Sequence, residues 1–97
     1  MSGLRFEWDE RKNRANVRKH GVSFKEAETV FSDEHALLIA DPDHSLAEDR
    51  FILLGLSGDL RALAVCHCYR GEDVVRFISA RRATRRERSQ YNRRWFT

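Results

Sequence analysis

Long uncharged runs are missing from this sequence. Its longest ones, such as Ala62–Tyr69, fall far short of the ~20 apolar residues that a membrane-spanning helix needs. The start of the chain also lacks the pattern of a secretory signal, because Leu4–Trp8 already alternates with charged residues. We therefore expect a soluble, cytoplasmic protein with no membrane partner.

Proline and glycine are scarce, with one proline and five glycines among 97 residues. No linker rich in glycine, serine or proline divides the sequence, and it contains no internal repeat. Because a chain of this length suits one hydrophobic core, we expect a single domain over residues 1–97.

Only two cysteines are present, Cys66 and Cys68, and they flank His67 in a predicted strand. Their side chains then point to one face about 7 Å apart, too far for a disulfide without distortion. A zinc site needs about four ligands at motif spacing, and the sequence supplies no second pair. We interpret the cysteines as strand-filling thiols and expect no metal and no cofactor. The loop with Asp41, Asp43 and His44 leaves a magnesium site open as an alternative, which loss of activity in EDTA would support.

Acidic residues are almost absent from the C-terminal end. Residues Arg76–Thr97 contain one acid, Glu87, and eight arginines, a net charge of +7. The other 75 residues contain ten lysines and arginines and fourteen acids, a net of −4, and the two parts sum to the overall +3. This asymmetry predicts a phosphate-bearing partner for the basic end.

Helix signals occur at three places. Asp9 is a predicted N-cap and Gly21 a left-handed stop, which gives a helix from about Glu10 to His20. Capping boxes at Ser23 with Glu26 and at Thr84 with Glu87 predict the other two helices. These run from Ser23 to about Asp33 and from Arg85 to about Arg94.

Alternating or short apolar runs predict strands. Leu4–Trp8 suits a short edge strand, and four further runs joined by turns suit an antiparallel meander: Ala36–Ala40, Arg50–Leu56, Arg61–Tyr69 and Val74–Ala80. We therefore expect an α+β fold with a small antiparallel sheet of about four strands, two N-terminal helices and one C-terminal helix.

Two blocks of residues resemble the BrnT toxin family. The first comprises Phe6-Glu7-Trp8-Asp9, Lys12-Asn13, Asn16, Lys19 to Phe24, Ala27, Phe31 and Asp33. The second comprises His44, Glu48, Arg50, Gly55, His67, Arg76, Ile78 to Thr84, Glu87-Arg88 and Tyr91. Two long motifs in the right order are more specific than one short pattern. The cysteines depart from the pattern, at positions that concern packing.

This resemblance implies a RelE-like fold and an mRNA-cleaving toxin of a type II toxin–antitoxin system. It further implies a BrnA-like ribbon-helix-helix antitoxin that neutralises the toxin in a two-to-two assembly. A homodimer is the other assembly we consider. The resemblance does not give the cleavage preference or the dependence on ribosomes.

Cleavage of RNA without a metal requires a base, an acid and fixed cations for the charge on the phosphorane. His67 is the candidate acid or base, because an unperturbed imidazole titrates at a pKa of about 6.5. Arg76 would join it if the hairpin register sets the two side by side, which the sequence leaves open. The alternative is a strand histidine satisfied by a neighbour. If His67 were enclosed in the core and the arginines shared no concavity, the proposed centre would fail.

Arg81 and Arg82 are candidate phosphate contacts, with a solvated charge or an ion pair to the acidic segment Glu26–Asp49 as the alternative. Arg50 is a candidate catalytic cation, and an ion pair with Glu48 is its structural alternative. Arg76, Arg81, Arg50 and His67 are thus our predicted catalytic residues.

The predicted RNA-binding residues are Arg82, Arg85, Lys19, His20 and Tyr91. Lys19 and His20 are equally explained by the dipole at the end of a helix. Tyr91 could stack on a base, although its spacing with Trp95 favours docking on a partner. We also expect the aromatic end with Tyr91, Trp95 and Phe96 to bury against an antitoxin or a second copy of the chain. The rival to the enzyme hypothesis is a non-catalytic module whose arginine-rich helix only binds nucleic acid or a protein.

Overall fold

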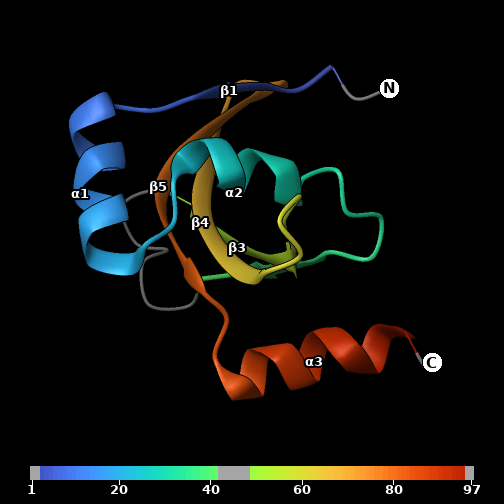
Figure 1. The fold of residues 1–97 in the computed structure, drawn as a ribbon. Coiled ribbons are helices and arrows are strands. Elements are labelled where there is room, and N and C mark those ends of the chain that lie inside the picture. The colour runs from blue at the N-terminus through green and yellow to red at the C-terminus, as the bar shows by residue number, and fades with distance from the viewer. Residues whose placement is uncertain (1–2, 42–48, 96–97) are drawn as a thin grey trace.

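The computed structural model describes residues 3–41 and 49–95. In this part of the chain, five strands form one mixed sheet and three helices pack around it (Figure 1). The elements in chain order are β1 (Arg5–Glu7), α1 (Glu10–His20), α2 (Phe24–Val30), β2 (Leu37–Ala40), β3 (Phe51–Leu56), β4 (Ala62–Arg70), β5 (Val74–Arg82) and α3 (Arg85–Trp95). The α+β class and the placement of the helices are as predicted.

The strand order is β1-β5-β4-β3-β2. Strands β2 to β5 form the expected antiparallel meander, whereas β1 adds a fifth strand that runs parallel to β5. The all-antiparallel sheet of about four strands was therefore an incomplete prediction. Alternation marks a strand but does not tell which edge it joins, and β1 reaches β5 only in the folded chain.

The predicted helix caps are present, with one exception. The Asp9 carboxylate accepts the Arg11 N–H at 2.8 Å, and Gly21 ends α1 at a φ of 69°. Thr84 and Glu87 form a complete capping box at α3. At α2 only half of the box forms: the Ser23 hydroxyl accepts the Glu26 N–H, but the Glu26 carboxylate binds Arg61 and Ser57 instead.

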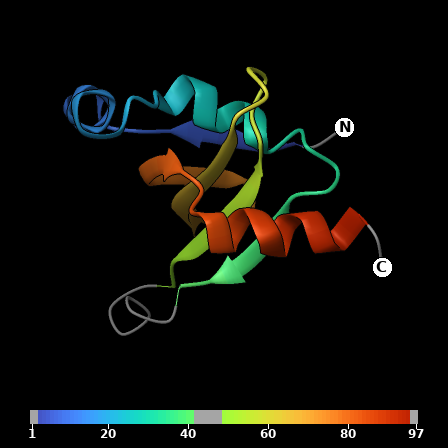
Figure 2. The ribbon, with the colours of Figure 1, turned by 60° about the horizontal axis from the view of Figure 1, so that its bottom comes forward.

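Helices α1 and α2 cover one face of the sheet, which we call the inner face, while α3 lies on the other side (Figures 1 and 2). Phe77 on β5 is the centre of the inner core and is only 1% exposed. Its ring lies 5.6 to 6.0 Å from four other rings, those of Phe6, Trp8, Phe24 and Phe31. Burial of these aromatic side chains, each worth about 2–3 kcal/mol, is the main term holding the helices on the sheet.

A β-bulge interrupts the hairpin of β4 and β5. His67 pairs with Phe77 and Cys66 pairs with Ser79, which leaves Ile78 without an opposite residue. Phe77 and Ala80 are three positions apart and would face opposite sides of a regular strand, yet both are buried in the inner core. The bulge therefore resets which residues of β5 face inward.

Asn16 on α1 completes the open edge of β5. Its side-chain amide donates to the Ala80 carbonyl at 2.8 Å and to the Val22 carbonyl at 2.7 Å, and its oxygen accepts the Ala80 N–H at 3.1 Å. The neighbouring Asn13 accepts the Phe24 N–H at the start of α2. These two asparagines hold the N-terminal helices to each other and to the sheet.

Gly55 on β3 allows α2 to approach closely. A Cβ atom there would lie 2.9 Å from the Asp33 carboxylate and from Val30, closer than real contacts permit. Asp33 can consequently accept the Leu56 N–H at 2.8 Å. The same carboxylate oxygen accepts the Tyr91 hydroxyl at 2.7 Å, so that Asp33 also anchors α3.

Candidate nucleic-acid interface

His67 lies on the inner face, fully enclosed at 0% exposure. The rings of Phe31, Phe51 and Tyr69 surround it at 5.0 to 6.2 Å. Its Nδ1 is 3.0 Å from the Val65 carbonyl, which can only accept, so Nδ1 carries the proton and Nε2 faces the Tyr69 hydroxyl at 3.3 Å. Burial lowers the pKa of His67 below its ordinary value of 6.5, and the imidazole is held neutral.

The hairpin register, which the sequence left open, does not set His67 and Arg76 side by side. The register places Arg76 opposite Cys68 and Phe77 opposite His67, and side chains opposite each other share a face. Arg76 therefore points to the other side of the sheet, which we call the outer face. The catalytic assignment of His67 stays a prediction, and its enclosure argues against it.

Arg76 is held at the edge where β1 meets β5. Its Nη1 donates to the Glu7 carboxylate at 2.8 Å, and the Nε of Arg70 lies 3.4 Å from the same oxygen. Two cations thus share one carboxylate. The Arg76 side chain is 29% exposed and remains accessible to a ligand.

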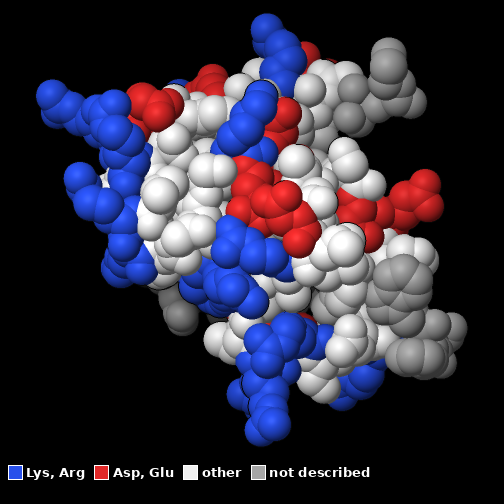
Figure 3. All heavy atoms as spheres, viewed as in Figure 1, with Lys and Arg blue, Asp and Glu red and all other residues white. Residues whose placement is uncertain are grey.

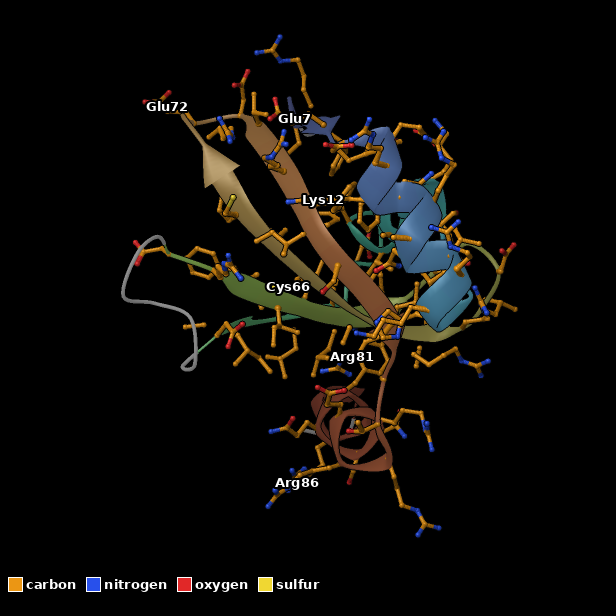
Figure 4. The ribbon with its side chains drawn as sticks, turned by 90° about the vertical axis from the view of Figure 1, so that its left-hand side faces the viewer. Glu7, Lys12, Cys66, Glu72, Arg81 and Arg86 are labelled. Atoms are coloured by element: carbon orange, nitrogen blue, oxygen red, sulfur yellow. The ribbon has the colours of Figure 1, made fainter. Side chains whose placement is uncertain are left out.

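Arg81 lies at the opposite end of β5, where the chain passes into α3 (Figure 4). Its two terminal nitrogens donate to the two oxygens of Glu87 at 2.7 and 2.9 Å. This bidentate contact lowers the pKa of Glu87 and raises the pKa of Arg81. The alternative of an ion pair is thus realised with Glu87, which lies outside the acidic segment Glu26–Asp49 named in the prediction.

Arg50 belongs to a polar group at the centre of the outer face. It precedes Phe51, which pairs with the inward His67, so alternation directs Arg50 outward. Cys66 is nearby: burial first and then the Asp41 carboxylate raise the pKa of its thiol, while Arg50 acts in the opposite direction. Its sulfur lies 3.9 Å from Asp41, and Ser79 stands opposite on β5. The suggested Arg50–Glu48 ion pair falls outside the described residues.

Three of the four predicted catalytic residues, Arg50, Arg76 and Arg81, therefore lie on the outer face, with Arg76 and Arg81 at opposite ends of β5, whereas His67 lies on the inner face. The outer face also contains Cys66 and Ser79, which the sequence interpretation did not select as site residues, and Asp41, which it named only for the magnesium alternative. Ser79 lies on this face because it pairs with Cys66. This pairing depends on the bulge, so the alternation of residues in the sequence does not predict it.

The remaining predicted RNA-binding residues are spread over two helices. Arg82 and Arg85 are exposed near the start of α3, and Lys19 is exposed at the end of α1, where His20 is half-buried. Tyr91 does not fit the docking prediction, because it is only 4% exposed and its hydroxyl is bound to Asp33. Phe96 and the side chain of Trp95 lie outside the described residues.

Helix α1 is a second basic surface that the emphasis on the C-terminus missed. It contains one acid and five exposed cations, Arg11, Lys12, Arg14, Arg18 and Lys19. In Figure 3 basic atoms run along α1 on the left and along α3 at the bottom, with acidic atoms between them. A count of charged residues over Glu10–His20 in the sequence would have predicted this surface.

The described residues contain neither a cluster of metal ligands nor a membrane-spanning helix. Within residues 3–41 and 49–95, no three His, Cys, Asp or Glu side chains gather as metal ligands would. Asp43 and His44 of the magnesium alternative are not among these residues. In the same part of the chain, no helix has the length and low polarity that crossing a bilayer requires.

Comparison with known proteins identifies the family. The family model described as "Ribonuclease toxin, BrnT, of type II toxin-antitoxin system" matches residues 8–87. The chain belongs to the BrnT family. The crystal structure of the Brucella abortus ribonuclease toxin BrnT is similar, with a TM-score of 0.64 and 28% sequence identity over 84% of this chain and 99% of that one. No sequence among the curated proteins matches significantly. The suspected resemblance is thus confirmed, and the basic surfaces belong to a member of a ribonuclease toxin family.

Proposed function

We propose that this BrnT family member is a metal-independent endoribonuclease that cleaves mRNA and so inhibits translation. The observation that carries the proposal is the family match over residues 8–87, which spans strands β2 to β5 and the start of α3. The net charge of +7 on residues 76–97 supports a polyanionic substrate.

The chemistry we propose is attack of the 2′-hydroxyl on the adjacent phosphate. The hydroxyl gives up its proton to water, and the P–O5′ bond breaks. The released 5′-oxygen takes a proton from water, and a 2′,3′-cyclic phosphate remains. Negative charge builds on the phosphorane in this step, and guanidinium groups fixed beforehand stabilise it. The outer face offers Arg50, Arg76 and Arg81. Because Arg76 and Arg81 lie at opposite ends of β5, we assign this role to whichever of the three lies at the cleaved phosphate and contacts to the flanking phosphates to the others. Glu7 and Glu87 orient Arg76 and Arg81 and thereby reduce the cost of ordering them.

His67 has a structural part in this proposal. The sheet separates it from the outer arginines, so one phosphate cannot contact both sets. Its neutral imidazole bridges the Val65 carbonyl and the Tyr69 hydroxyl within the inner core. Arg82, Arg85, Lys19 and His20 are proposed as contacts to the RNA backbone beyond the cleaved phosphate, where exposed cations contribute mainly through counterion release.

A non-catalytic nucleic-acid-binding module is the second candidate. The enclosure of His67 and the ion pairs of Arg76 and Arg81 favour it, because paired cations can be purely structural. The two candidates differ in what arginine substitutions do. An active centre predicts that Arg50→Lys or Arg76→Lys abolishes cleavage while RNA binding persists, since lysine keeps the charge but loses the planar fork. A binding module predicts a graded loss shared among many arginines.

Cleavage of a synthetic RNA by the purified chain tests the enzyme proposal. We expect cleavage in EDTA and products that end in a 2′,3′-cyclic phosphate. A matched oligonucleotide with one 2′-deoxy residue at the cleaved position should stay intact, because it lacks the attacking hydroxyl. Dependence on added Mg²⁺ would contradict metal independence and support the magnesium alternative.

We also propose that a BrnA-like ribbon-helix-helix antitoxin neutralises the chain in a two-to-two assembly. The type II toxin–antitoxin family implies an antitoxin partner, which supports this proposal. Growth arrest on induction of the chain, relieved by the small gene encoded beside its own, is the expected result. Light scattering of the purified complex would give the stoichiometry, and a homodimer of the chain alone would contradict bridging by the antitoxin.

A further inference from the structure

A pocket of about 800 Å³ lies between α3 and the turn that joins β3 to β4. This volume is within the range of about 300–1,000 Å³ typical of ligand sites. The aliphatic side chains of Leu56, Leu60 and Ala62 contribute to its wall, together with the arginines Arg61, Arg82 and Arg88. The pocket thus combines an apolar wall with a basic rim, and neither the predicted catalytic centre nor the inner core uses it.

Leu60 has a backbone conformation and a solvent exposure that are both unfavourable for leucine in a turn. It is the one non-glycine residue at positive φ among those described, with a φ of 62°, and its side chain is 80% exposed. Asparagine, aspartate or glycine would suit both this backbone and the solvent better. The Leu60 N–H donates to the Ser57 carbonyl at 2.9 Å, which fixes the turn and presents the side chain at the pocket. Because Leu60 lines one pocket together with Leu56 and Ala62, it extends a contiguous apolar surface, and contiguous apolar surfaces are where partners bind.

The rim is positively charged. Glu26 compensates Arg61 through an ion pair, whereas Arg82 and Arg88 form no ion pair within the described part of the chain. Arg88 donates to the Ala83 carbonyl at 3.0 Å, which directs its guanidinium along the pocket. The ligand that complements this rim carries negative charge next to an apolar group.

A nucleotide and an acidic protein segment both carry negative charge next to an apolar group. The residues that line the pocket favour the protein segment. Stacking of a base requires an open aromatic face, but the Tyr91 ring at this pocket is buried and its hydroxyl is bound to Asp33. Among the described residues that line the pocket, the exposed apolar groups are aliphatic. They complement an apolar side chain that inserts between α3 and the turn, flanked by carboxylates for Arg82 and Arg88.

We propose that this pocket is the docking site of the antitoxin, which inserts an apolar side chain from an acidic segment. The proposal rests on the antitoxin partnership given under Proposed function. It places neutralisation beside the start of α3, next to Arg81 and Arg82, so that a bound antitoxin would also cover part of the basic surface.

The substitution Leu60→Asn tests the proposal without endangering the fold, because asparagine tolerates a positive φ. The probe is the small protein encoded beside the chain, titrated against the purified variant. We expect binding at least tenfold weaker than that of the unaltered chain, an unchanged melting temperature and unchanged cleavage of RNA. Leu38→Asn is the matched control: Leu38 is 48% exposed on the edge strand β2 and does not line the pocket, so its variant should bind normally.

Three outcomes would overturn the proposal. If Leu60→Asn and the unaltered chain bind the neighbouring protein equally, the pocket is wrong while the antitoxin partnership stands. If the unaltered chain does not bind that protein at all, both fail. If Leu60→Asn weakens binding of a single-stranded RNA dodecamer and leaves the protein complex intact, the pocket is a nucleotide site.

Discussion

On the inner face of β4 and β5, the ionisable side chain of His67 is enclosed by aromatic rings and held neutral. On the outer face, Arg76 and Arg81 keep their charges because carboxylates of Glu7 and Glu87 accompany them. The two faces belong to the same strands and differ in the side chains that they carry and in what covers them. The difference shows that one alternating sequence supplies a packed core on one side and a chemically available surface on the other.

Truncation in the inner core should have the largest effect on stability. Phe77→Ala removes the ring that contacts four other aromatic side chains and leaves a cavity that the sheet cannot close. We expect a loss of about 3–5 kcal/mol in the free energy of unfolding, measured by urea denaturation. A loss below 1 kcal/mol would show that the inner face is not the main core.

Removal of the edge contact should come next. Asn16→Ala deprives the Ala80 N–H and carbonyl and the Val22 carbonyl of their partner. Because these groups are buried, we expect a loss of about 2–3 kcal/mol. Amide hydrogen exchange should show faster exchange at Ala80 than at positions inside the β4–β5 ladder. Arg14→Ala, an exposed change on the same helix, is the control and should be nearly neutral.

Acid should weaken the inner face through His67. Its pKa is lowered in the folded chain, so the unfolded chain binds the proton more readily below about pH 6.5. The neutral imidazole contributes fully to the free energy of unfolding above that pH. This contribution is lost as the pH falls toward the lowered pKa of the folded chain, by at most about 1.4 kcal/mol per pH unit. Urea denaturation at pH 7.5 and 5.5 measures this loss. His67→Gln should show a smaller difference, and an equal difference would contradict the neutral, enclosed imidazole.

Substitutions on the outer face should have the smallest effect on the free energy of unfolding and the largest effect on RNA cleavage. Arg76→Ala breaks a partly exposed ion pair, for which we expect a loss of no more than about 1 kcal/mol. RNA cleavage should nevertheless fall at least tenfold if the outer arginines stabilise the transition state. The control is Arg5→Ala, because Arg5 is also ion-paired, with Asp73, but is 74% exposed at the sheet edge. Equal loss of cleavage in both variants would favour a general binding surface over a defined centre.

Much of the fold could be predicted from local signals. Asp9 and Gly21 bounded α1, and Thr84 with Glu87 marked the start of α3, because caps act through backbone groups a few residues away. The candidate site was predicted less well. The choice of the arginines as site residues stays a prediction. Their partners Glu7 and Glu87 and the orientation of His67 could not be foreseen, because they depend on contacts between elements distant in the sequence.

Composition and short-range pattern alone determined the helices, the strands of the meander, the basic end and the family motifs, since each arises from residues close together in the chain. Only the tertiary structure decided that β1 joins β5, that Ile78 forms a bulge, and that Tyr91 is buried against Asp33. It also decided that His67 faces the core while Arg76 faces outward. The physical reason is that a strand's register and the cover on each of its faces are set by distant residues, so local sequence cannot specify them.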